Sequence, residues 1–185
     1  MGDWSRELTS DERRLILAAR QKAFLLYEGR LTRHRSCGIA MAETFGLGTR
    51  PYQALRRGGI TGHGECGVVV SGRMVLGEVF GDPDPAGATT PVLAASMREY
   101  VERVTERMDR GAAAGDSVVC NVLTAPFPDF RGAARASFCA ALATEVATLV
   151  AEVILRNGGE VDVSPIPGVE SFDPAQPVEP LPTSA

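Results

Sequence analysis

The sequence has little histidine, little cysteine and few aromatic residues. Of its 185 residues, two are histidines and four are cysteines, and Phe, Trp and Tyr together make up 6%. With so few histidines, we do not expect a histidine-rich catalytic centre. The chain also contains no serine–histidine–acid arrangement, phosphate loop or metal-hydrolase motif. These absences leave the cysteines as the side chains with the strongest chemical signal.

Long apolar runs are missing as well. Residues 1–14 (MGDWSRELTSDERR) contain no apolar segment of the kind found in secretory signal peptides, and no run elsewhere approaches the length of a membrane span. We therefore expect a cytoplasmic protein that does not bind membranes. Because cytoplasmic thiols are kept reduced, the four cysteines indicate metal binding or redox chemistry rather than structural disulfides.

The charge is weakly negative overall but unevenly placed. The formal net charge of −4 argues against a general nucleic-acid-binding protein. Six arginines lie between residues 30 and 57 against a single acid, whereas residues 158–185 contain five acids and no basic residue. Two solvated surfaces of opposite sign would produce this pattern. The alternative is a site for a small anionic molecule or an acidic partner beside the first cysteine, formed by Arg33, Arg35, Arg56 and Arg57.

Helix signals recur along the chain. The capping box Thr9-Ser10-Asp11-Glu12 predicts a helix over residues 10–28, and Thr90-Pro91 predicts another from 91 to about 110. Apolar periodicity predicts further helices over residues 37–45 and about 130–156. Residues 66–80 are ambiguous, because Val68-Val69-Val70 favours a strand, but the length of the segment favours a helix.

The breaks between these segments define the domain organisation. Residues 58–64 contain four glycines, which predicts a glycine-rich loop, and six prolines lie between residues 165 and 185. We therefore predict a mainly α fold, in which residues 1–157 form a single-domain helical bundle. An acidic, Pro-rich tail over residues 158–185, extended or disordered, would follow it.

Two short stretches, RHRSCG at 33–38 and GHGECG at 62–67, each place a histidine three residues before a cysteine and a glycine after it. The four cysteines are separated by 29, 54 and 19 residues, without any Cys-x-x-Cys, so thioredoxin, zinc-finger and bacterial ferredoxin spacings are absent. A helix N-terminus and nearby cations would favour the thiolates of Cys37 and Cys66. Glycines beside the sulfurs would let backbone N–H groups reach them; these are Gly38, Gly64 and Gly67.

The order of these features resembles the C_GCAxxG_C_C family of redox-active proteins, which is named for four cysteines and a Cys-Gly-Ala-x-x-Gly motif. Cys37-Gly-Ile-Ala-Met-Ala, followed by Phe45-Gly-Leu, is similar to the first element of that family. Gly58-Gly-Ile-Thr-Gly-His-Gly-Glu-Cys66-Gly is similar to its glycine loop and second cysteine. Cys120 and Cys139 stand in the third and fourth places.

The resemblance covers residues 20–156 and implies that the four cysteines act together. It also implies cluster binding, since the family is similar to a cytochrome type that carries an additional iron–sulfur centre. The match has two departures: Val68 replaces the alanine of the motif, and one extra residue precedes Gly72.

The leading interpretation is an iron–sulfur redox protein, with a [2Fe–2S] centre favoured, held by Cys37, Cys66, Cys120 and Cys139. It would act with a redox partner protein in electron transfer, redox sensing or cluster-based catalysis. His34 and His63 would lie beside these ligands or substitute for one. Three alternatives stay open: a metal-free thiol–disulfide protein, a zinc site, and a helical interaction protein with buried cysteines. The sequence also leaves open whether the protein is an oxidoreductase or serves one, and whether it is a homodimer.

Overall fold

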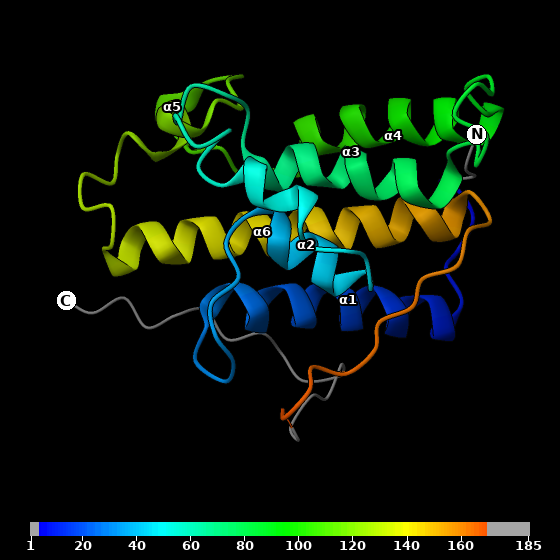
Figure 1. The fold of residues 1–185 in the computed structure, drawn as a ribbon, viewed down its shortest axis with the longest axis horizontal. Helices are drawn as coiled ribbons and strands as arrows, with labels where there is room; N and C mark the ends of the chain where they lie inside the picture. The colour runs from blue at the N-terminus through cyan, green and yellow to red at the C-terminus, as the bar shows by residue number, and fades with distance from the viewer. Residues whose placement is uncertain (1–3, 170–185) are drawn as a thin grey trace.

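A computed structural model describes residues 4–169, and this part of the chain is mainly helical, as predicted (Figure 1). Its elements, in chain order, are α1 (Ser10–Glu28), α2 (Gly38–Thr44), the 3-10 helix η1 (Pro51–Leu55), α3 (Gly67–Phe80), α4 (Pro91–Arg107), the 3-10 helix η2 (Ala112–Ala114), α5 (Cys120–Thr124) and α6 (Ala133–Arg156). The described residues contain no strand, only a single antiparallel bridge between Glu65 and Val119.

Helix α6 is the centre of the bundle. In Figure 1 it runs between α1 on one side and α3 and α4 on the other, and it contacts all three of these helices and α2. Among the described residues it is the one helix long and apolar enough to cross a membrane by length and composition. However, 67% of its most apolar window is buried inside the bundle, so its apolar character fits its place in the core.

Local capping explains where the long helices begin and end. Thr9 caps α1 by accepting a hydrogen bond from the Glu12 N–H, and the Glu12 carboxylate accepts one from the Thr9 N–H, which completes the predicted capping box. Gly29 ends α1 with a φ of 79°, a conformation that favours glycine. Thr90 caps α4 as predicted, but α4 ends at Arg107, a few residues earlier than its apolar pattern suggested.

The segment with ambiguous periodicity, residues 66–80, forms helix α3. Val68, Val69 and Val75 are fully buried because α3 packs against three other helices, α2, α4 and α6, whereas Val79 is exposed. A helix covered on several sides loses the apolar stripe that would identify it, so the length of the segment is the better indicator. Tyr100 of α4 crosses to α3 and donates a hydrogen bond of 2.8 Å to the Val69 carbonyl.

Residues 158–169 form neither helix nor strand, as predicted for the start of the tail, but they pack on the core. Val161 and Ile166 are 8% and 3% exposed and belong to the hydrophobic core. In Figure 1 this segment runs back along the side of α1. Residues 158–169 are therefore irregular in backbone but attached to the core by apolar side chains, with Val163 and Val169 partly buried beside Val161 and Ile166. Residues 170–185 lie outside the described part of the chain.

Candidate functional site

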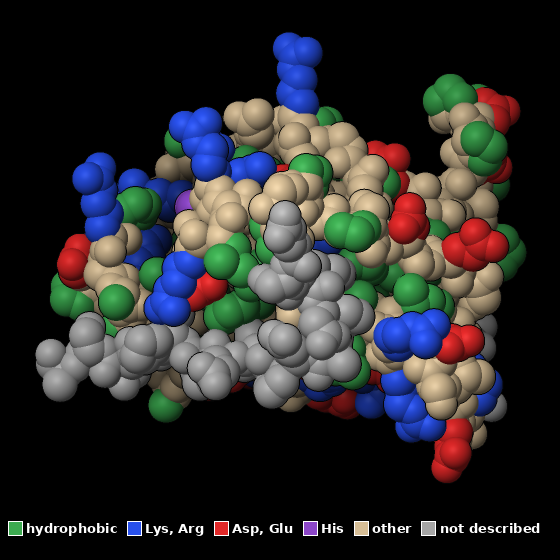
Figure 2. All heavy atoms as spheres, turned by 90° about the horizontal axis from the view of Figure 1, so that it is seen from below, with side chains coloured by type: hydrophobic (Ala, Val, Ile, Leu, Met, Phe, Trp, Pro, Cys, Tyr) green, Lys and Arg blue, Asp and Glu red, His purple; other side chains and the backbone are tan. Residues whose placement is uncertain are grey.

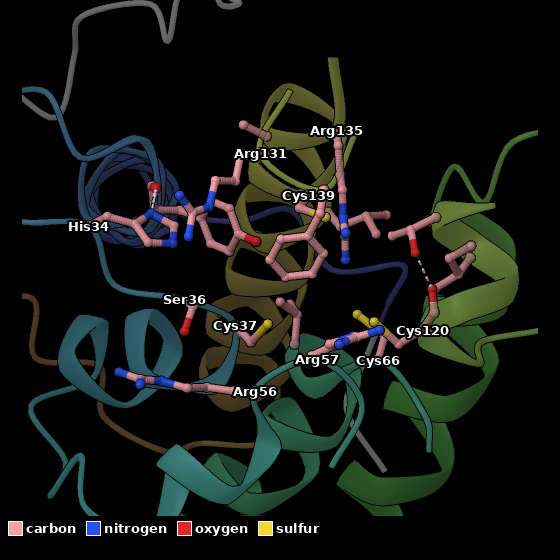
Figure 3. A pocket seen from close by; sticks show the side chains of 17 residues that line it. His34, Ser36, Cys37, Arg56, Arg57, Cys66, Cys120, Arg131, Arg135 and Cys139 are labelled. Carbon is pink, nitrogen blue, oxygen red and sulfur yellow. Dashed lines mark hydrogen bonds between the residues drawn. The ribbon is translucent and has the colours of Figure 1, made fainter. Parts of the chain in front are cut away.

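All four cysteines line one pocket of about 570 Å³ at one end of the bundle (Figure 3). They come from different places in the fold. Cys37 and Cys66 directly precede α2 and α3, Cys120 opens α5, and Cys139 lies in the second turn of α6. Cys66 and Cys120 are buried, Cys37 and Cys139 are half-buried, and none forms a disulfide. The fold thus brings together residues that are far apart in the sequence.

Backbone hydrogen bonds join the segments that carry Cys66 and Cys120. The Cys66 N–H donates to the Val118 carbonyl at 2.7 Å, and the Cys120 N–H donates to the Gly64 carbonyl at 3.0 Å. The Asn121 N–H continues the pairing by donating to the Gly62 carbonyl at 2.9 Å. The glycine-rich loop is therefore fixed along the start of α5, although it contains no helix or strand.

Glycines permit this close approach. A Cβ atom on Gly58 would lie 2.6 Å from the Cβ of Cys120, and its φ of 55° also favours glycine. A Cβ atom on Gly67 would lie 2.1 Å from the Leu55 carbonyl oxygen and 3.1 Å from the Cβ of Cys37. Gly38 is similarly confined between Leu55 and neighbouring side chains. These glycines thus let the cysteine-bearing segments pack closely.

Backbone N–H groups reach two of the four sulfurs. The Cys37 sulfur is within reach of the Arg57 N–H, and the Cys66 sulfur is within reach of the N–H groups of Val68 and Val69 in the first turn of α3. Gly64 instead donates its N–H to the Gly58 carbonyl at 3.1 Å. The donors to sulfur are thus residues adjacent to Gly58 or just after Gly67 in the chain.

Cys37 and Arg57 also share an uncommon backbone conformation. Their φ angles are 48° and 50°, and Ile60 is the only other non-glycine residue with a positive φ in the described part of the chain. Such angles are costly for residues with a Cβ atom and persist where surrounding structure enforces them. Two residues that line the same pocket are therefore held in strained conformations.

Tyr27, at the end of α1, links Cys139 to Cys37. Its hydroxyl lies within hydrogen-bonding reach of the thiols of Cys139 and Cys37, and its ring lies in the pocket. Burial raises the pKa of the Tyr27 hydroxyl well above its usual value, so it stays protonated and can donate to sulfur. The sequence analysis missed this residue, because its place in an apolar helical pattern indicates only a core position.

Burial also raises the pKa of all four cysteine thiols above their ordinary value of 9.0, and that of Cys66 reaches about 12. Neighbouring thiols add to the shift at Cys37, Cys66 and Cys120, which places the cysteines within electrostatic range of one another. The positive charges of Arg57 and Arg135 lower the pKa of Cys120, but not enough to cancel the effect of burial. Helix-end N–H groups at Cys66 and cations at Cys120 and Cys139 therefore do lower the thiol pKa, in the expected direction, but burial outweighs them.

The two histidines differ in position. His34 lines the pocket, and its Nδ1 donates a hydrogen bond to the Tyr27 carbonyl, while its ring stands edge-on to the Tyr27 ring. His63 is exposed in the glycine loop and does not line the pocket, although its own N–H donates to the Thr61 hydroxyl. The structure thus brings one of the two histidines to the cysteines.

The arginine patch expected from the sequence is divided. Arg56 and Arg57 line the pocket, but Arg33 and Arg35 do not, and Arg35 instead forms an ion pair with Glu43 at 2.7 Å. In Figure 2, several basic side chains gather at the left end of the molecule, which in Figure 1 is the end where α1 finishes and α6 begins.

Two further arginines, Arg131 and Arg135, complete the cationic lining of the pocket. Arg135 stacks over the ring of Phe130 at 4.0 Å, and Arg57 approaches the same ring at 5.3 Å. Sequence reasoning missed these residues because they lie far from the first arginine cluster. Arg135 nevertheless precedes Cys139 by four residues, one helical turn, and this spacing was a usable signal.

The cysteine arrangement bears on the kind of metal that it could hold. Among residues 4–169, no three His, Cys, Asp or Glu side chains lie close enough to bind a single ion. The thiols instead surround a common space from several sides. Four thiolates are the ligand set of iron–sulfur clusters and also suit zinc, so the donor chemistry of the pocket fits either metal centre.

Comparisons with known proteins identify no relative of this chain. The chain matches no family model, no curated protein and no solved structure, so the resemblance to the four-cysteine family stays a prediction.

Proposed function

We propose that this chain is an iron–sulfur redox protein whose cluster, a [2Fe–2S] centre in the simplest form, is held by Cys37, Cys66, Cys120 and Cys139. One observation carries the proposal: every cysteine of the sequence lines the same pocket, although the four come from separate elements. Incidental core cysteines would be scattered through the bundle, as its other small apolar residues are.

The arrangement favours a cluster over the alternatives. A zinc ion requires its ligands around one point, about 2.3 Å from each sulfur, and no such group exists among the described residues. Thiol–disulfide exchange requires an attacking thiolate, and burial raises the pKa of all four thiols. A polynuclear centre tolerates wider spacing and drives thiol deprotonation by coordination itself.

The surroundings would tune such a centre. A bound cluster supplies one-electron redox chemistry. Arg57 and Arg135 place positive charge beside the sulfurs, and the N–H groups of Arg57, Val68 and Val69 point to them. Cations and hydrogen bonds to sulfur favour the more negative, reduced state and therefore raise the reduction potential. Replacing Arg135 by Gln should lower this potential.

Four single Cys→Ala variants, purified without oxygen, test the ligand set. We expect each substitution to abolish or greatly reduce the iron and acid-labile sulfide per chain, because each removes one of four ligands. Ser36→Ala is the matched control, since Ser36 also lines the pocket and directly precedes Cys37. Loss of iron and sulfide in only two of the four variants would contradict a four-cysteine centre and favour a smaller site or a disulfide pair.

A further inference from the structure

The pocket is unusual in its charge. Its lining includes four arginines and no aspartate or glutamate. None of the four forms an ion pair within residues 4–169, whereas most other arginines of that part do. Arg56, Arg57 and Arg131 are exposed and Arg135 is half-buried. Several cations on one pocket wall without carboxylate partners attract anions, and at exposed positions salt weakens this attraction. The four side chains are Arg56, Arg57, Arg131 and Arg135.

These arginines fall into two pairs. Arg57 and Arg135 act on the cysteines, since both lower the pKa of Cys120 against the effect of burial. They also flank Phe130. Figure 3 shows them on the same side of Cys37 as Cys120, whereas Arg56 and Arg131 lie on the opposite side of Cys37.

The side of the pocket with Arg56 and Arg131 also contains His34 and Ser36 (Figure 3). Arg56 and Arg131 are exposed, and within residues 4–169 their guanidinium groups form no ion pair or hydrogen bond. The Ser36 hydroxyl is a further donor on this side. The pocket thus has a sulfur end and a separate cationic end.

A charge count shows that the cationic end is not needed for the cluster. A [2Fe–2S] centre held by four thiolates is doubly negative when oxidised, and Arg57 and Arg135 supply two compensating charges beside the sulfurs. The positive charges of Arg56 and Arg131 are then left without a compensating negative charge from the cluster. Guanidinium groups bind carboxylate and phosphate oxygens through paired hydrogen bonds.

We propose that Arg56 and Arg131, with Ser36, bind the phosphate or carboxylate group of a small organic anion beside the cysteines. The pocket volume of about 570 Å³ lies within the usual range of small-molecule sites. Phe130, Ala136 and Leu142 offer an apolar wall for the rest of such a molecule. A redox role for this ligand rests on the proposed function, but binding of the anion does not.

Calorimetric titration of the purified full chain with inorganic phosphate, and separately with succinate, tests this site. We expect at least one probe to bind, and the double variant Arg56→Gln/Arg131→Gln to weaken its binding at least about tenfold. Arg33→Gln/Arg50→Gln is the matched control, because it removes the same charge from two exposed arginines that do not line the pocket. Its affinity should stay within about twofold of wild type. The probe that binds identifies the phosphate or the carboxylate as the recognised group.

Iron content, measured on the same samples, separates this inference from the proposed function. Loss of probe binding with normal iron content in the Arg56/Arg131 variant supports the anion site. Joint loss of iron and probe binding would assign these arginines to the cluster and overturn the inference, as would a wild-type chain that binds neither probe. A metal-free wild-type chain that still binds a probe would uphold the anion site and remove the proposed function.

Discussion

Replacing Gly67 by alanine should damage both the fold and the cysteine pocket. Gly67 opens α3 directly after Cys66, and its added Cβ would lie 2.1 Å from the Leu55 carbonyl oxygen and 2.9 Å from the Leu55 carbonyl carbon. Both atoms belong to the backbone of η1, so no side-chain rotation can relieve the overlap. Either η1 or the start of α3 must shift, and Cys37, whose Cβ would be 3.1 Å away, lies at the same contact.

The magnitude follows from two opposing effects. Overpacking costs about 1–3 kcal/mol, and a clash with backbone belongs at the upper end. Alanine regains up to about 1 kcal/mol over glycine in a helix. We therefore expect Gly67→Ala to lower the free energy of unfolding by about 2 kcal/mol. Gly77→Ala, in the same helix, is the control: outside the adjacent backbone of α3, no atom lies within 4 Å of its added Cβ, so it should raise the free energy of unfolding by about 0.5–1 kcal/mol.

Urea unfolding, followed by the circular dichroism of the helices, measures this difference. With a slope of about 2 kcal/mol per molar urea, the midpoint of Gly67→Ala should fall by about 1 M, while that of Gly77→Ala should not fall. Iron content gives a second readout, since displacement of Cys66 from Cys37 should reduce it. If Gly67→Ala were as stable as Gly77→Ala, the packing of α3 against η1 described above would be wrong.

Three further changes test other parts of the structure. Tyr100→Phe removes the hydrogen bond to the Val69 carbonyl and should cost about 1 kcal/mol in urea unfolding; unchanged stability would contradict that bond. Hydrogen bonds from Arg6 and then Thr9 lower the pKa of Glu12 from 4.5 to about 2, so its contribution to stability is present above pH 4.5 and disappears as the pH falls toward about 2. Glu12→Gln should therefore flatten the pH dependence of the melting temperature in that window, and an unchanged profile would refute this. Because burial raises the pKa of the four thiols, reconstitution of the metal-free chain with iron and sulfide should release protons and be more complete at pH about 8.5 than at about 6.5; a pH-independent yield would contradict thiol coordination.

The fold was predictable where local chemistry decides it. The Thr9–Glu12 capping box, Gly29 and the Thr90-Pro91 pair determine helix ends through bonds and angles within a few residues. Packing decides the rest. Residues 158–169 have a composition typical of a tail, yet Val161 and Ile166 are buried in the hydrophobic core, and the local sequence does not mark these two residues as core positions.

In the candidate site, too, some residues could be identified from the local sequence and others only from the packing of distant elements. The family resemblance grouped the four cysteines, and the structure places them in one pocket. Arg131 and Tyr27 could not be assigned to this pocket from spacing, since their place in its lining depends on how the start of α6 and the end of α1 pack. The two histidines share the spacing His-x-x-Cys-Gly, but His34 lines the pocket with its ring against Tyr27, whereas His63 lies in the glycine loop and does not line the pocket. Sequence repetition alone does not distinguish these environments.

The metal and sulfide content of the wild-type chain, purified without oxygen, tests the central claim most directly. The account predicts a brown protein that absorbs visible light, contains iron and acid-labile sulfide in equal amounts, about two of each per chain for a [2Fe–2S] centre, and has no freely titratable thiol. A colourless protein with one zinc per chain would contradict it. Four titratable thiols without any metal would contradict it as well.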